Sequence, residues 1–233
     1  MRTAVCFSGL LRPATFECIE NIIESIVRPN NADVFIHTWN TNEPHSILSD
    51  EVTQREVYTY VLEKLSPKLF EIQEKIYFDP NKYPHSHDIP KLGLWAVSSL
   101  QSMFYSIMKA NDLKKRYEKE NNFKYDCVFR CRLDIKLTET YEAKKYDLNS
   151  IMTSTNSDIL AFSNSNNMDH YSDLYNRLDS FSDKYSWQPE AKLMRHLSGH
   201  NIVPLDITAT KNIVRTISDE QVVDAILKMA NEK

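Results

Sequence analysis

Short apolar runs alternate with longer amphipathic segments along the first third of the chain. The runs at 2–7 and 33–39 predict buried strands, and 68–78 predicts a third extended segment. The segments at 13–26 and 51–65 place apolar residues at helical spacing and predict helices between those strands. The predicted order is therefore strand, helix, strand, helix, strand.

The rest of the chain continues this alternation. Apolar positions at helical spacing predict a helix over 92–121, about 40 Å long at about 1.5 Å per residue. The stretch 79–90 has no period and predicts a mobile loop. Further strands are predicted at 126–133, 158–162 and 201–205, and further helices at 169–181, 189–197 and 219–229. This pattern predicts an α/β fold with a mainly parallel central sheet flanked by helices, whose ligands bind beyond the carboxyl ends of the strands.

The composition is that of an ordinary globular protein. The 233 residues are 42% hydrophobic and 26% charged, which excludes disorder and fits one domain. The apolar runs are too short for a transmembrane segment, and the N-terminal run fits a buried strand better than a leader peptide. A net charge of -4 gives no field that attracts polyanions, so we expect no nucleic-acid partner.

The numbers of cysteines and glycines add two constraints. Cys6, Cys18, Cys127 and Cys131 lack the spacing of a zinc site, and a chain of this length needs no disulfide. Reduced thiols and a cytoplasmic location are therefore expected. Glycine is scarce, with three in the chain, and Gly9 follows the first predicted strand, where it would let the backbone approach a ligand closely.

The strongest candidate for chemistry is the predicted strand at 126–134. A period of two places Arg130, Arg132 and Asp134 on one face at the end of an otherwise apolar strand. In one interpretation the strand is half exposed and Arg132 merely pairs with Asp134. In the other, an anionic ligand meets the guanidinium groups, because burying them unpaired is costly. A diphosphate on a metal ion would fit, with Asp134 as the oxygen ligand.

The turn after the first strand is a second candidate. Ser8, Gly9, Leu10 and Arg12 precede a predicted helix, whose N-terminus favours anions. The turn lacks the G-x-G-x-x-G pattern of dinucleotide sites and the G-x-x-x-x-G-K pattern of P-loops. A structural turn and a nucleotide contact both remain open, and Arg12 favours the contact.

Polar residues near other element ends complete the candidate set. His37 and Trp39 close the second strand, where they either face the same crevice or serve the core. Gln101 belongs, with Ser102 and Ser106, to a polar edge of the long helix that either faces a sugar or eases helix packing. Glu190, in the first turn of a later helix, either favours the helix dipole or acts as a general base in the crevice.

Taken together and in this order, five segments resemble a known enzyme family. They are Val5-Cys-Phe-Ser-Gly-Leu-Leu-Arg12, Asp33-Val-Phe-Ile-His-Thr-Trp39, Ser102-Met-Phe-Tyr-Ser-Ile-Met-Lys109, Tyr125-Asp-Cys-Val-Phe-Arg-Cys-Arg-Leu-Asp134 and Pro189-Glu190. The chain up to about residue 205 resembles small glycosyltransferases of the GT-A type, encoded by large DNA viruses and by bacterial surface-polysaccharide loci. The resemblance implies a Rossmann-like single domain over 1–233, with a nucleotide-binding half at 1–134 and an acceptor-side half at 135–233.

The resemblance also implies an activity. A sugar would pass from a UDP- or GDP-linked donor to a hydroxyl of a glycan acceptor. In such enzymes an Asp-X-Asp-like motif binds Mn²⁺ or Mg²⁺ across the diphosphate; here Arg132 replaces the first acid and Asp134 is left as the metal ligand. Glu190 would deprotonate the acceptor in an inverting enzyme. Donor contacts would come from Ser8, Gly9, Leu10, Arg12, His37, Trp39, Gln101, Arg130 and Arg132.

Two alternatives to a glycosyltransferase remain. A sugar-1-phosphate nucleotidyltransferase has a related architecture, but it would be expected to carry a phosphate loop rich in glycine and lysine after the first strand. Residues 8–13 contain one glycine and no lysine. A non-catalytic nucleotide-sugar-binding module on the same scaffold is consistent with the replaced first acid.

Overall fold

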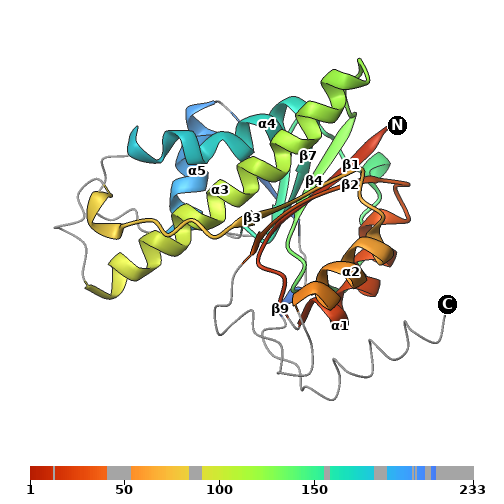
Figure 1. The fold of residues 1–233 in the computed structure, drawn as a ribbon. Coiled ribbons are helices and arrows are strands. Elements are labelled where there is room, and N and C mark those ends of the chain that lie inside the picture. Colours follow the sequence, from red (N-terminus) through yellow and green to blue (C-terminus); the bar gives the residue numbers. More distant parts are fainter. Residues whose placement is uncertain are drawn as a thin grey trace.

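The computed structural model describes residues 1–12, 14–40, 54–83, 91–154, 158–180, 188–200, 202, 204–207 and 211–213. Over these ranges the chain forms an α/β fold, in which a seven-stranded, mostly parallel sheet is flanked by helices (Figure 1). Most of the predicted loop at 79–90 and the whole predicted helix at 219–229 lie outside the described residues.

The central sheet is mixed, and its first four strands are parallel. The strands are β1 (Thr3–Gly9), β2 (Asp33–Asn40), β3 (Leu69–Glu74), β4 (Cys127–Cys131), β6 (Ile151–Ser154), β7 (Leu160–Ser163) and β8 (Pro204–Ile207), and their order is β3-β2-β1-β4-β7-β6-β8. β7 runs antiparallel to β4 and β6, and β8 pairs parallel with β6. Phe7 lies beside Ile36 of β2 and Cys131 of β4. The carboxyl ends of β1 to β4 therefore meet at one edge.

Helices cover both faces of this sheet (Figure 1). One face carries α1 (Ala14–Ile22), which continues as the π-helical turn η1 (Ile23–Val27), and α2 (Gln54–Leu65); the other carries α3 (Lys91–Glu120), α4 (Ser165–Ser172) and α5 (Pro189–Gly199). Short 3-10 segments are η2 (Pro80–Lys82), η4 (Ala143–Lys145) and η5 (Asp173–Ser180), and a small second sheet pairs β5 (Ile135–Leu137) with β9 (Lys211–Ile213). The Asn164 side chain caps α4 by accepting a hydrogen bond from the Asn167 N–H at 3.0 Å.

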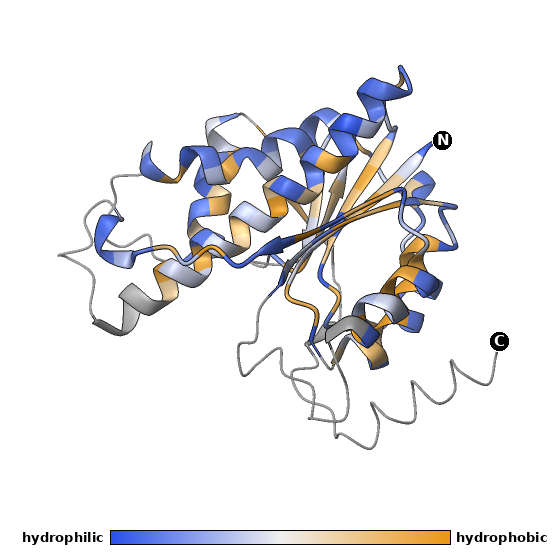
Figure 2. Cartoon of the chain, in the orientation of Figure 1, coloured by the Kyte–Doolittle hydropathy of each residue, from blue (hydrophilic) through white to orange (hydrophobic). Residues whose placement is uncertain are grey.

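Two apolar layers hold the sheet between the helices, because β1, β2 and β4 are buried on both faces. Phe7, Ile19, Val61 and Phe129 belong to the layer under α1 and α2. The layer under α3, α4 and α5 includes Phe35, Phe104, Val128, Tyr171 and Leu193. Figure 2 shows the hydrophobic residues of these helices turned toward the strands. The expectation of free thiols agrees with the structure, since Cys6 is buried in the α3 layer and Cys18, Cys127 and Cys131 in the α1 layer, all without disulfides.

A buried ion group joins α3 to α4. Lys114 is completely buried, and its Nζ donates to Ser165 Oγ at 2.7 Å, Asp169 Oδ1 at 2.8 Å and Glu118 Oε2 at 3.1 Å. Lys124 adds a second cation at 3.2 Å from Asp169. Burial by itself would raise the pKa of Asp169, but these two lysines and Asn111 lower it below the ordinary value. The group fixes how α4 crosses the long helix.

Most predicted elements are confirmed to within a few residues. The predicted helix at 92–121 is α3, and the predicted strands at 33–39 and 126–133 are β2 and β4. The half-exposed interpretation of 126–134 is wrong in one respect, because every residue of β4 is buried. The prediction omits β5, β6 and β9, which have three or four residues, although it includes β7 and β8, which have four residues each.

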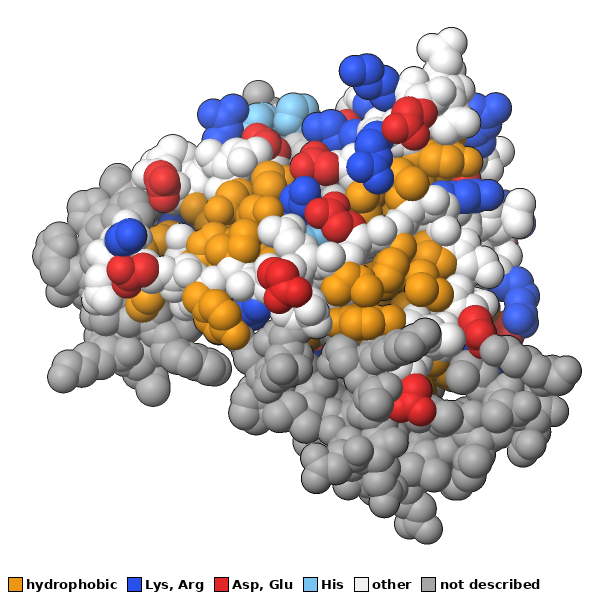
Figure 3. Space-filling view, viewed as in Figure 1, with side chains coloured by type: hydrophobic (Ala, Val, Ile, Leu, Met, Phe, Trp, Pro, Cys, Tyr) orange, Lys and Arg blue, Asp and Glu red, His pale blue; other side chains and the backbone are white. Residues whose placement is uncertain are grey.

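The surface gives two further observations. No helix in the described part of the chain is both long enough and apolar enough to cross a membrane. On the face of the molecule in Figure 3, basic and acidic side chains are interspersed and do not separate by sign. The expectation that the chain has no nucleic-acid partner stays a prediction, and this face offers no broad basic patch against it.

Candidate functional site

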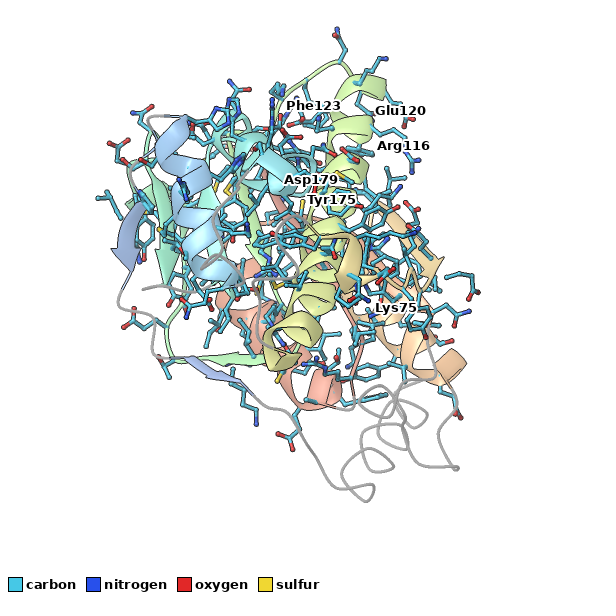
Figure 4. All side chains as sticks on the ribbon, turned by 90° about the vertical axis from the view of Figure 1, so that its left-hand side faces the viewer. Lys75, Arg116, Glu120, Phe123, Tyr175 and Asp179 are labelled. Atoms are coloured by element: carbon cyan, nitrogen blue, oxygen red, sulfur yellow. The ribbon has the colours of Figure 1, made fainter. Side chains whose placement is uncertain are left out.

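A pocket of about 260 Å³ lies at the carboxyl edge of the parallel strands. Its walls come from the ends of β1, β2 and β4, the residue after β3, and one turn of α3. The lining residues are Ser8, Gly9, Leu10, Arg12, Trp39, Lys75, Ser99, Ser102, Met103, Arg130, Arg132, Leu133 and Asp134. Figure 4 shows Lys75 beyond the end of β3. The pocket thus lies where an open α/β sheet binds its ligands.

Local hydrogen bonds place Arg12 at the pocket. The Arg12 N–H donates to Thr15 Oγ1 at 3.2 Å, and the Thr15 N–H donates to the Arg12 carbonyl at 2.9 Å. This reciprocal pair fixes the chain as it enters α1. The guanidinium group of Arg12 reaches across to Asp134, where Nη1 lies 2.6 Å from Oδ2.

Asp134 accepts hydrogen bonds from two arginines. Arg132 Nε donates to Oδ1 at 2.7 Å and Arg132 Nη2 donates to Oδ2, so that Arg132 binds the carboxylate in a bidentate manner. Burial would raise the pKa of Asp134, but Arg132 and then Arg12 outweigh it and lower the pKa below the ordinary value. The predicted pairing of Arg132 with Asp134 is therefore present, and Arg12 joins it.

Arg130 is buried without adequate partners. It is 3% exposed, and its Nε and Nη1 atoms have no hydrogen-bond partner among the described residues. The nearest carboxylate is Asp158, whose Oδ2 lies 3.6 Å from Nη2, which is too long for a hydrogen bond. A buried guanidinium group in this state is costly, and an anion in the pocket would relieve that cost.

A polar chain beneath the pocket holds the first turn. Gly9 has a φ of +112°, a conformation that favours glycine, and its N–H donates to Ser106 Oγ at 2.9 Å. Ser106 Oγ also lies 2.8 Å from His37 Nδ1, and His37 Nε2 lies 3.2 Å from Gln73 Oε1. Burial lowers the pKa of His37 despite its bond to Gln73, so the ring is neutral and accepts from the Ser106 hydroxyl. His37 thus supports the Gly9 turn from below and does not line the pocket.

Trp39 lines the pocket with little exposed surface. It is 1% exposed, stacks on Tyr105 with ring centroids 5.4 Å apart, and has Lys75 Nζ 5.6 Å from its ring centroid. In this arrangement Trp39 is a packed wall of the site, and its ring face is not open for stacking on a base.

Eight of the eleven predicted site residues meet in the pocket, and three lie elsewhere. The lining includes Ser8, Gly9, Leu10, Arg12, Trp39, Arg130, Arg132 and Asp134. Besides His37, Gln101 lies outside it, with its Oε1 buried and unpartnered among the described residues. Glu190, in the first turn of α5, is also not a lining residue.

Four lining residues, Lys75, Ser99, Met103 and Leu133, escaped the sequence prediction. Ser99 and Met103 lie one helical turn apart on α3, next to the predicted Ser102, and Lys75 directly follows β3. Lys75 lies inside the predicted extended segment 68–78, and because β3 ends earlier, at Glu74, the rule that ligands bind at the carboxyl ends of strands did not identify it. Met103 carries no chemical signal in the sequence.

Whether a divalent ion fits depends on the oxygen ligands of the pocket. Asp134 is the only carboxylate lining the pocket in the described part of the chain, and both of its oxygens already accept from guanidinium groups. Within the same ranges, no three or more His, Cys, Asp or Glu side chains gather as a metal site. The residues therefore do not fit the resident Mn²⁺ or Mg²⁺ that the family resemblance implies.

Comparison of the sequence with protein-family models and with curated proteins finds no significant match. The function must therefore be inferred from the chemistry of the pocket.

Proposed function

We propose that this chain is a nucleotide-sugar-dependent glycosyltransferase of the GT-A type, which moves a sugar from a UDP- or GDP-linked donor to a hydroxyl of a glycan acceptor. One observation carries the proposal: Arg12, Arg130 and Arg132 converge on one pocket at the carboxyl edge of the sheet, and Arg130 is buried there with N–H groups that find no hydrogen-bond partner in the described part of the chain. A diphosphate is the ligand whose charge and oxygen atoms match three guanidinium groups.

The arginines would act on the leaving group. As the bond between the anomeric carbon and the diphosphate breaks, negative charge grows on the phosphate oxygens. Guanidinium groups already held in place stabilise this charge without reorganisation, and loss of one such group costs about 3 kcal/mol of transition-state stabilisation. Arg130 provides this charge from a buried position, where it is least weakened by solvent.

The fold and the placement of the pocket support the nucleotide-binding role of the N-terminal half. The lining residues that the structure describes all fall between Ser8 and Asp134, within the half expected to hold the donor. The sheet is mostly parallel there, as the GT-A expectation requires. The acceptor-side role of residues 135–233 is part of the proposal.

The proposed mechanism gives Glu190 no step. Its carboxylate does not line the pocket, so it is not positioned as the acceptor base in this arrangement. Transfer that retains the configuration at the anomeric carbon needs no such base. The arginine-rich pocket is compatible with a retaining reaction, in which the charge on the departing diphosphate is the main thing to stabilise.

A nucleotide-sugar-binding module without transferase activity is the second candidate. The observation that favours it is the pairing of Asp134 with two arginines, which leaves no unpaired carboxylate in the described pocket lining. Such a pocket could bind a donor without turning it over.

A panel of UDP- and GDP-sugars distinguishes these functions. For a glycosyltransferase we expect thermal stabilisation by one donor and slow release of free UDP or GDP from it, measured by a coupled assay for the nucleoside diphosphate. Stabilisation without release supports the binding module. Formation of a nucleoside triphosphate and a sugar 1-phosphate from the donor when pyrophosphate is added supports a nucleotidyltransferase. No stabilisation by any donor would refute all three.

A further inference from the structure

The charges around the pocket are out of balance. Among the described residues, Arg12, Arg130 and Arg132 line it together with one carboxylate, that of Asp134. Asp158 lies next to Arg130 but is 3.6 Å away, and it offsets only part of the remaining charge. This excess of positive charge among the described residues favours an anionic ligand.

Asp134 occupies the place that one phosphate of such a ligand would take. The two arms of Arg132 and one arm of Arg12 bind its carboxylate, and the same fork geometry binds phosphate. The side chains of Arg12 and Arg132 are 25% and 24% exposed, whereas that of Asp134 is 5% exposed. The guanidinium groups of Arg12 and Arg132 are therefore accessible to a ligand in the pocket while they bind Asp134.

We propose that Asp134 is an internal counter-ion, which the diphosphate displaces from Arg12 and Arg132, so that nucleoside diphosphates bind by anion exchange and without a divalent ion. The inference rests on the proposed function and names how that site takes its ligand. The inference also gives Asp134 a role without a metal ion. Arg12 and Arg132 both bind its carboxylate, and they need this partner while the pocket is empty.

The two roles of Asp134 predict opposite effects of its removal. A counter-ion competes with the ligand, because the ligand binds only the fraction of molecules whose arginines are available. Removing the carboxylate charge then strengthens binding. A metal ligand instead helps the diphosphate to bind, and removing its charge weakens binding and abolishes any dependence on the metal.

The test is calorimetric titration of the full chain with UDP and with GDP, in EDTA and in Mn²⁺. We expect wild-type affinity in EDTA to lie within about twofold of that in Mn²⁺. We expect Asp134→Asn, which keeps the shape and removes the charge, to bind about tenfold more tightly in EDTA. Asp173→Asn is the matched control, since Asp173 forms an exposed pair with Arg177 outside the pocket, and its affinity should equal that of the wild type.

The outcomes separate this inference from the proposed function. Binding that requires Mn²⁺, or weaker binding by a folded Asp134→Asn protein, would overturn the counter-ion role and leave the glycosyltransferase proposal standing. If neither nucleotide binds wild type under either condition, the proposed function itself fails. Should Asp134→Asn not fold, the metal dependence of the wild type decides: binding in EDTA supports the inference, and a requirement for Mn²⁺ overturns it.

Discussion

At the scale of single residues, the pocket contains a side chain that lowers stability and favours the binding of an anion. Arg130 is buried where its Nε and Nη1 atoms find no hydrogen-bond partner among the described residues, and a protein selected for stability alone would hold an apolar side chain there. Local costs of this kind concentrate where a ligand binds.

Replacing Arg130 should separate binding from stability. We expect Arg130→Met to weaken nucleoside diphosphate binding by about 10- to 100-fold, because charged hydrogen bonds contribute about 1.5–3 kcal/mol. The melting temperature should fall in Arg130→Met, because Asp158 is left buried without its cation, and should stay unchanged or rise in the double variant Arg130→Met, Asp158→Asn, which removes both charges. Calorimetry and thermal denaturation measure the two effects. Arg28→Met, which removes an exposed arginine paired with Glu24, should change neither, and a double variant less stable than Arg130→Met would contradict this account.

The backbone at Gly9 gives a second test at this scale. A Cβ atom there would meet no other atom within 4 Å, so any cost of Gly9→Ala comes from the positive φ. We expect Gly9→Ala to lower the free energy of unfolding by about 1–3 kcal/mol, measured by urea denaturation. Gly199→Ala at the end of α5, where space is equally open and φ is not positive, is the control and should be nearly neutral. Equal effects would mean that φ is not the cause.

At the scale of elements, the sequence reveals long elements better than short ones. The 30 residues of α3 show a clear helical period, whereas β6, with four residues, does not. The reversal of β7 between β4 and β6 was not predictable, because strand direction depends on long-range pairing. In the pocket, the period of two identified Arg130, Arg132 and Asp134. The position of Glu190 outside the pocket depends on how α5 packs, and no local sequence pattern encodes that packing.

The buried ion group between α3 and α4 can be tested as a structural unit. We expect Lys114→Met to lower the free energy of unfolding by about 3–5 kcal/mol, because Glu118 and Asp169 lose their buried cation. Lys115→Met is a neighbouring control, since its exposed ion pair with Asp112 has a distance of 3.9 Å and should contribute less than about 1 kcal/mol. Denaturant titration of both variants measures the difference. Similar values for the two would show that the buried group contributes no more than a surface pair.

At the scale of the whole molecule, two buried histidines make stability depend on pH. Burial lowers the pKa of His37 and of His196 below 6.5, so both are neutral in the folded chain, while the unfolded chain binds protons near pH 6.5. The unfolded state thus takes up more protons as the pH falls below about 6.5. The two neutral histidines therefore cost the fold no stability above that pH, and the free energy of unfolding decreases as the pH falls below it.

This dependence gives a measurable slope. We expect the free energy of unfolding to fall as the pH is lowered from 7 toward 5, by up to about 1.4 kcal/mol per pH unit for each histidine. His37→Gln should lose part of this slope, and His196→Gln should lose the other part. Urea denaturation at several pH values measures the slope. An unchanged slope in His37→Gln would exclude His37 as a contributor.

The four cysteines offer a built-in report on how the fold opens. Burial raises the pKa of every one of them, to about 12 for Cys6, Cys18 and Cys131, so none forms the reactive thiolate at neutral pH in the folded chain. Cys6 lies in the layer under α3, and the other three lie in the layer under α1 and α2. The alkylation rate of each thiol therefore measures how often its own apolar layer opens to solvent, and no label has to be introduced.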